Sequence, residues 1–177
     1  CASQFDSGIA TKMSRRIYQS KESYRSVPTK ILSALDALYG PLCDSRHVAQ
    51  VSRGLEKLHR GLTRDRKRFI KSRYLKDRDV CLAYATYMVC AQAPKLDAIV
   101  ERLGPLPKLD RPLRVLELGC GPGTGIASLG CLAETQGVEI EHIATDRVPE
   151  ALDAARRLSN ALKLDHVDYK LVDLSRG

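Results

Sequence analysis

The sequence has no apolar stretch long enough to cross a membrane. The uncharged run Val80–Pro94 includes two tyrosines, a threonine and a glutamine, whereas a membrane-spanning helix needs about 20 mostly apolar residues. Residues 1–30 are polar and basic and lack the apolar core of a secretory signal. We therefore expect no membrane association and an intracellular protein, cytoplasmic in a bacterium or mitochondrial in a eukaryote.

The cysteines lack the spacing of a metal site. No two of the six are separated by two residues, which excludes the Cys-x-x-Cys motif of zinc and redox sites. Scattered cysteines in a chain of this size are typical of reduced, buried thiols in an intracellular protein. We expect no bound metal.

The composition excludes a disordered or collagen-like chain. The 177 residues are 44% hydrophobic and 28% charged, close to the average of globular proteins. Because a domain usually has roughly 100–200 residues, the length suits one domain, or one domain with part of a second.

Positive charge is concentrated in one segment. Arg53–Arg78 contains eleven basic and three acidic residues, so its net charge equals the +8 of the whole chain. Such a cluster attracts the phosphates of nucleic acids, although a solvated helix surface is an open alternative. The candidate RNA-binding residues are Arg53, Lys57, Arg60, Arg64, Arg66, Lys67, Arg68 and Lys71.

The first part of the chain reads as a basic helical domain, residues 29–103, after an irregular segment, 1–28. Apolar residues recur at helical spacing in three runs. The predicted helices run from the N-cap Thr29 to Gly40, from Asp44 onward, and from about Asp79 to Leu103 with a break or kink at Pro94. Residues 104–112 contain three prolines and form the predicted linker.

After the linker the pattern changes to short apolar strands alternating with helices. The predicted strands are 113–118, 139–145 and 167–172, and the predicted helices are 124–134 and 149–162. Strand and helix in alternation with short loops predict an α/β fold, a Rossmann-like, doubly wound parallel sheet over residues 113–177.

A glycine-rich turn follows the first predicted strand, with the pattern Glu-x-Gly-x-Gly-x-Gly from Glu117 to Gly123. A dinucleotide fingerprint would need glycine at Thr124 or Ile126, and a phosphate-binding P-loop would need a lysine. Glycines there let backbone amides approach a ligand.

Carboxylates stand at or near the ends of the three predicted strands: Glu117, Asp146 and Asp173. At the carboxyl ends of parallel strands they can accept hydrogen bonds from ribose and amino groups. A loop-capping role for Asp146 and Asp173 is the alternative.

Two of these motifs resemble a known family. Val115–Gly123 is similar to motif I of class I S-adenosylmethionine-dependent methyltransferases, and Asp146–Arg156 is similar to their post-strand acidic position and next helix. The resemblance implies S-adenosyl-L-methionine as cofactor, with the glycines cradling its methionine part and Glu117 orienting it. The implied cofactor-binding residues are Glu117, Gly119, Cys120, Gly121, Gly123, Asp146 (ribose), Arg147, Asp173 and Leu174 (adenine).

The helical region resembles a narrower group. Arg60–Arg66, Ser72–Asp77 and Leu82–Tyr87 are similar to the helical leader of the Rsm22 family, methyltransferase-like proteins associated with the small ribosomal subunit. This resemblance implies rRNA or the small ribosomal subunit as partner. An ordinary helical cap is the alternative for these short motifs.

The part of a class I sheet that contacts the methyl acceptor has no counterpart among the three predicted strands, so the catalytic residues are unknown. We expect a fragment, or a sheet completed by residues or a partner chain not shown. The sequence predicts a methyltransferase acting on or docked to rRNA. The alternatives are a non-catalytic, RNA-binding ribosome-assembly factor and a small-molecule methyltransferase.

Overall fold

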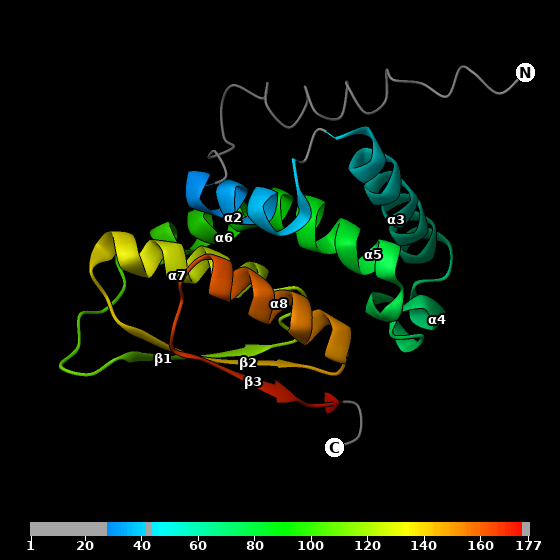
Figure 1. The fold of residues 1–177 in the computed structure, drawn as a ribbon. Helices are drawn as coiled ribbons and strands as arrows, with labels where there is room; N and C mark the ends of the chain where they lie inside the picture. Colours follow the sequence, from blue (N-terminus) through cyan, green and yellow to red (C-terminus); the bar gives the residue numbers. More distant parts are fainter. Residues whose placement is uncertain (1–27, 42–43, 175–177) are drawn as a thin grey trace, which may run out of the picture.

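The computed structural model describes residues 28–41 and 44–174 (Figure 1). The irregular segment predicted for residues 1–28 lies outside the described residues except for Pro28. Within the described part of the chain, no helix combines the length and the apolar character that crossing a bilayer requires.

The first two helices begin close to the predicted positions. Helix α2 spans Thr29–Tyr39, and Gly40 ends it with a φ of 81°. The predicted N-cap was wrong: Thr29 is already helical, and Pro28, with a fixed φ and no N–H, precedes it. Helix α3 spans Ser45–Arg64, and the Asp44 carboxylate caps it by accepting the N–H of its second residue at 3.1 Å.

The third predicted helix is a continuous run of three helical segments from residue 78 to residue 103, and two shorter helices precede it. The bounds are α4 Arg66–Lys71, η1 Tyr74–Lys76, α5 Arg78–Ala83, η2 Tyr84–Met88 and α6 Val89–Leu103. The predicted break at Pro94 is absent, since α6 continues through this buried proline. The irregular turn is η2, a π-helical turn that precedes the proline. A proline removes one backbone hydrogen bond, and here the helix tolerates that loss.

The second part of the chain forms the α/β fold that its pattern predicted. The bounds are β1 Leu113–Leu118, α7 Thr124–Gln136, β2 Ile140–Asp146, α8 Pro149–Ala161 and β3 Val167–Leu171. The strands are parallel and lie in the order β1-β2-β3. Their carboxyl ends, with the residues that follow, therefore lie at one edge of the sheet.

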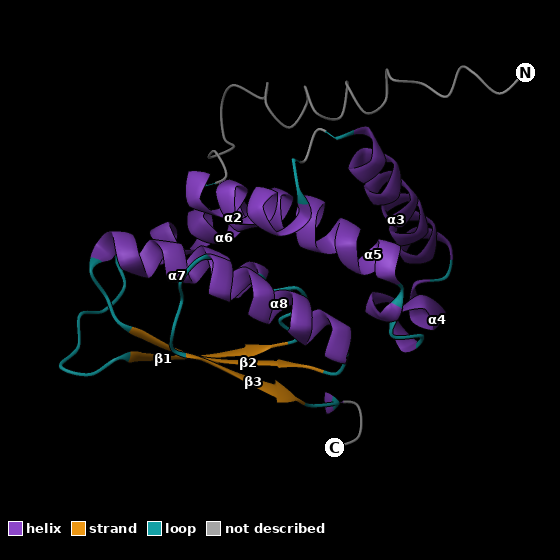
Figure 2. Ribbon diagram, in the orientation of Figure 1, coloured by secondary structure: helices purple, strands orange, loops and turns teal. Residues whose placement is uncertain are grey.

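Among the described residues the helices lie on one face of the sheet (Figures 1 and 2). Helices α7 and α8 lie next to the strands, and α2 and α6 cover them. One apolar cluster joins all four helices: Ile31, Ala34, Leu35, Val89, Ala93, Ala127, Cys131, Leu158 and Leu162. The side chains of Leu116 and Leu118 point to the opposite face and are exposed. The predicted domain division at residues 104–112 stays a prediction.

Helices α3 and α5 approach each other closely at Gly54. A Cβ placed there would lie 2.1 Å from the carbonyl oxygen of Asp79 and 2.6 Å from Cβ of Ala83. The absence of a side chain therefore permits this close crossing of α3 and α5.

We predict that Gly54→Ala lowers the free energy of unfolding by about 1–3 kcal/mol, because the new methyl group collides with backbone that cannot move aside. Gly130→Ala is the matched control. It adds the same group to α7, but the methyl meets only the flexible end of the Leu164 side chain. Urea denaturation followed by circular dichroism measures both variants, and equal losses would contradict the packing argument.

Candidate functional site

The loop between β1 and α7 is bonded to the end of β2. The N–H groups of Gly119 and Cys120 both donate to the carbonyl oxygen of Thr145, at 2.9 and 2.8 Å. Gly119, Gly121 and Gly123 all have positive φ. Two observations explain why Gly123 is a glycine. Its φ is 94°, and a Cβ there would lie 3.1 Å from Ala155 in α8.

Asp146 connects the glycine loop to the start of α8. One of its carboxylate oxygens accepts the N–H of Gly121 and the other accepts the N–H of Val148, each at 2.9 Å. Asp146 is nearly buried, with 8% of its surface exposed. A carboxylate has about four acceptor positions, so these two bonds fit the loop-capping alternative and leave capacity for ligand hydroxyls.

Glu117 lies on the helix-covered face of β1 beside the first turn of α7. Its Oε2 is 3.0 Å from Nε2 of the buried His142 on β2. A Cβ at Gly125 would lie 2.4 Å from Oε1, so the glycine at the second position of α7 makes room for the carboxylate. A partly buried carboxylate needs a polar partner, and sequence reasoning did not identify His142 in that role.

The start of α7 carries a polar atom without a partner. Thr124 Oγ1 is buried and has no hydrogen-bond partner among residues 28–41 and 44–174. At neighbouring Gly119, nothing lies within 4 Å of where a Cβ would be. Buried hydroxyls are nearly always bonded, so an external ligand fits here. The signal that sequence reasoning missed was a hydroxyl residue directly after a glycine loop.

Two further predicted cofactor residues, Asp173 and Arg147, contact the helical region. Asp173 Oδ2 lies 3.0 Å from Nη2 of Arg73, and the guanidinium of Arg147 donates to the carbonyl oxygen of Ile70. Leu174 is exposed. The structure thus brings Glu117, the glycine loop, Asp146 and Asp173 to the carboxyl edge of the sheet. The cofactor role of all nine residues stays a prediction.

Burial at this edge keeps two nearby groups protonated. Burial raises the pKa of Tyr74 to about 12, with Tyr84 and the Asp146 carboxylate adding to the shift. Burial also raises the pKa of the Cys120 thiol to about 12, with the same effect from Glu117 and Asp146. A nucleophilic cysteine needs a lowered pKa, so Cys120 serves packing.

Two of the eight predicted RNA-binding cations are bonded to acids of α5 and the residue before it. Lys57 Nζ lies 2.7 Å from Asp77, whose hydrogen bond raises the pKa of the lysine, and Arg53 Nε lies 3.5 Å from Asp79. The other six have no carboxylate partner within the described ranges: Arg60, Arg64, Arg66, Lys67, Arg68 and Lys71. These six remain available to an anionic partner.

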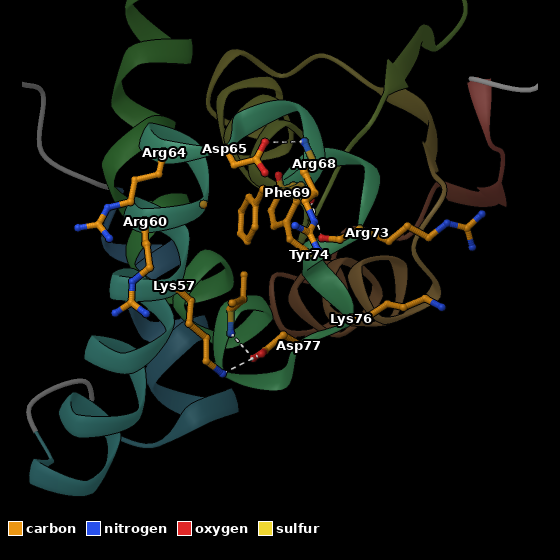
Figure 3. A pocket seen from close by; sticks show the side chains of 13 residues that line it. Lys57, Arg60, Arg64, Asp65, Arg68, Phe69, Arg73, Tyr74, Lys76 and Asp77 are labelled. Atoms are coloured by element: carbon orange, nitrogen blue, oxygen red, sulfur yellow. Dashed lines mark hydrogen bonds and ion pairs between the residues drawn. The ribbon is translucent and has the colours of Figure 1, made fainter.

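A cavity of about 580 Å³ opens between α3, α4 and η1. Figure 3 shows Phe69 and Tyr74 between the basic side chains of α3 and those of residues 73–76. The two rings are stacked, with centroids 4.8 Å apart. We call this the basic cavity; its cationic lining residues are Lys57, Arg60, Arg64, Arg68, Arg73 and Lys76.

The structure contains no metal-binding cluster in the part that it describes. No group of three or more His, Cys, Asp or Glu side chains gathers there. The described cysteines, Cys81, Cys90, Cys120 and Cys131, are free thiols.

The overall fold resembles that of solved methyltransferases. An O-methyltransferase family protein from Burkholderia thailandensis superposes with a TM-score of 0.52 at 20% identity, over 80% of this chain and 43% of that protein. The CMeT domain of the citrinin polyketide synthase gives a TM-score of 0.39 at 30% identity, over 54% of this chain and 25% of that one. This chain therefore spans less than half the length of either protein.

No family model matches the chain, and no curated protein matches it. The class I methyltransferase-like fold is therefore shown by structure, and the narrower resemblance to the Rsm22 family stays a prediction.

We predict that Asp146→Asn lowers the free energy of unfolding by about 1–3 kcal/mol. The new amide NH₂ faces a backbone N–H and leaves that buried donor without an acceptor. Asp168→Asn is the matched control, because Asp168 is exposed on β3 and pairs with exposed Lys170 at 3.3 Å. Thermal and urea denaturation compare the two, and a loss at Asp168 as large as that at Asp146 would refute the assignment.

Proposed function

We propose that this chain carries the cofactor-binding part of an S-adenosyl-L-methionine-dependent methyltransferase. The observation that carries the proposal is the arrangement at the carboxyl edge of the sheet. There the glycine loop is held by Asp146, and the buried hydroxyl of Thr124 lacks a partner among the described residues. The similarity in fold to an O-methyltransferase family protein supports the same conclusion.

The residues present fit the predicted cofactor. The glycine loop and the first amides of α7 suit the methionine carboxylate, because a helix N-terminus favours negative charge. The Glu117 carboxylate suits the ammonium group. Asp146 retains acceptor capacity for the ribose hydroxyls, and Asp173 lies at the adenine end. When bound, the cofactor supplies an electrophilic methyl group, so the protein contributes alignment and electrostatics.

A small-molecule acceptor is the first candidate, because it agrees better with the comparisons. The solved structure with the higher TM-score bears the name of an O-methyltransferase family. On this analogy the acceptor would be an oxygen atom of a small molecule. No catalytic residue is assigned to this reaction within the described residues.

RNA of the small ribosomal subunit is the second candidate, and a specific observation favours it. Six cations in and beside α4 have no carboxylate partner among the described residues, and they follow one another along the helical region. Phosphates bind such a surface by releasing condensed counterions. A ribosome-assembly factor that binds RNA without turnover would use the same surface.

Binding of S-adenosylhomocysteine tests the cofactor proposal. We expect calorimetry to show binding to the wild-type chain and affinity at least about tenfold weaker in Glu117→Gln, which loses a charge-assisted hydrogen bond. Glu141→Gln is the matched control, because Glu141 is exposed on β2 and pairs with exposed Arg114. Absence of binding by a folded wild-type chain would refute the proposal.

Charge reversal separates the two acceptor candidates. An RNA-facing surface predicts that Arg64, Arg66, Lys67 and Arg68 changed together to Glu abolish binding of single-stranded RNA. It also predicts a salt dependence for the wild-type chain. A plot of the logarithm of RNA affinity against the logarithm of salt concentration should have a slope of about −0.7 for each neutralised phosphate. The control reverses four exposed cations elsewhere: Lys95, Arg102, Lys108 and Arg111. Equal RNA affinity of the two variants would exclude the RNA candidate and leave the small-molecule acceptor as the remaining one.

A further inference from the structure

The register of β1 and β2 places Glu117 and His142 on one face of the sheet. Val115 is the cross-strand partner of His142, and Ala144 is the partner of Glu117. Residues two apart in a strand share a face, so the side chains of Glu117 and His142 are diagonal neighbours. Nε2 of His142 and Oε2 of Glu117 are 3.0 Å apart. The pair therefore connects the two strands on their helix-covered face.

His142 shares its face of β2 with an apolar cluster. Ala144, two residues further along, is fully buried in one cluster with Ile126 of α7 and Leu152 of α8. The His142 side chain is 3% exposed, and a buried polar group without a hydrogen bond costs free energy. Because a carboxylate accepts hydrogen bonds, Nε2 of His142 carries the hydrogen and donates it to Glu117.

The Glu117 carboxylate is enclosed on two sides. Its Oε2 accepts from His142, and its Oε1 faces Gly125 in the first turn of α7, where a side chain would collide with it. Among the residues that the structure describes, His142 is the one hydrogen-bonding partner of this carboxylate. A carboxylate has about four acceptor positions. Glu117 is therefore held in one orientation and keeps acceptor capacity for a ligand.

A carboxylate that binds an ammonium group has to keep its orientation and its negative charge. An imidazole can donate a hydrogen bond while it is uncharged, so His142 orients Glu117 without cancelling that charge. A lysine or arginine in the same place would neutralise it. Binding groups whose conformation is fixed by supporting hydrogen bonds hold a ligand more precisely than unsupported ones.

We propose that His142 is a positioning residue for the cofactor. It acts through Glu117, whose carboxylate it holds where the ammonium of S-adenosyl-L-methionine binds. This role rests on the proposed function, in which Glu117 accepts that ammonium, whereas the hydrogen bond from His142 rests on the geometry of the sheet alone. The imidazole itself lies buried behind the carboxylate.

Nitrogen-15 NMR of the cofactor-free chain at neutral pH tests the hydrogen bond. We expect the His142 ring to carry hydrogen on Nε2 alone, and the resonance of that proton to shift in Glu117→Gln. Hydrogen on Nδ1 alone, or on both ring nitrogens, would overturn the proposal. The measurement on the wild-type chain needs no variant, so it decides this point even where a variant does not fold.

Calorimetry with two probes tests the positioning role. One probe is S-adenosylhomocysteine, and the other is its deamino analogue, in which hydrogen replaces the α-amino group. In His142→Asn, whose side chain is too short to reach Glu117, we expect affinity for S-adenosylhomocysteine about tenfold weaker than in wild type. Affinity for the analogue should stay within about twofold, because the analogue has no ammonium group for Glu117 to bind.

Two variants serve as controls for His142→Asn. In His142→Gln the amide nitrogen can take the place of Nε2, and we expect affinity for S-adenosylhomocysteine to recover to within about threefold of wild type. His166→Asn makes the same change at an exposed histidine before β3 and should bind both probes as wild type does. Circular dichroism verifies that each variant is folded.

A double-mutant cycle decides whether His142 acts through Glu117. Glu117→Gln combined with His142→Asn should bind S-adenosylhomocysteine no more weakly than Glu117→Gln alone. Additive losses, equal losses for both probes, or wild-type affinity in folded His142→Asn would overturn the proposal and leave the proposed function intact. Absence of binding by the folded wild-type chain would overturn the proposed function and the positioning role together, while NMR would still decide the hydrogen bond.

Discussion

The carboxylate of Asp146 is the interaction on which the arrangement at the edge of the sheet depends. Its side chain accepts the N–H groups of Gly121 and Val148, and its backbone carbonyl oxygen accepts the N–H of Val172. One residue at the end of the central strand therefore fixes the loops after all three strands. An ionised carboxylate with two backbone donors is stable at low exposure, and this stability lets the glycine loop keep a conformation that glycine alone adopts easily.

The helical region adds a second constraint at the same edge. It contacts the loops after all three strands through the side chains of Tyr84 and Arg73 and the backbone carbonyl oxygen of Ile70. Of these three residues, Arg73 also lines the basic cavity. The helical region and the carboxyl edge of the sheet are therefore joined at three points.

Local patterns predicted the elements after residue 112 to within about two residues, because glycine, proline and apolar periodicity mark their ends. Contacts between distant parts of the chain left no such signal. His142 is 25 residues from Glu117, and Arg73 is 100 residues from Asp173, and neither pair has a spacing that could reveal it. The charge count identified the basic segment but not Asp77 and Asp79, the acids that pair with Lys57.

The shared cluster of α2, α6, α7 and α8 has a consequence for how the chain folds. Ile31 and Leu35 of α2 are buried in the same cluster as Leu158 and Leu162, which lie more than 120 residues later in the sequence. Contacts between residues so far apart slow folding, because a long loop must close before any burial compensates for it. On the ribosome, α2 exposes its apolar side until α8 has emerged.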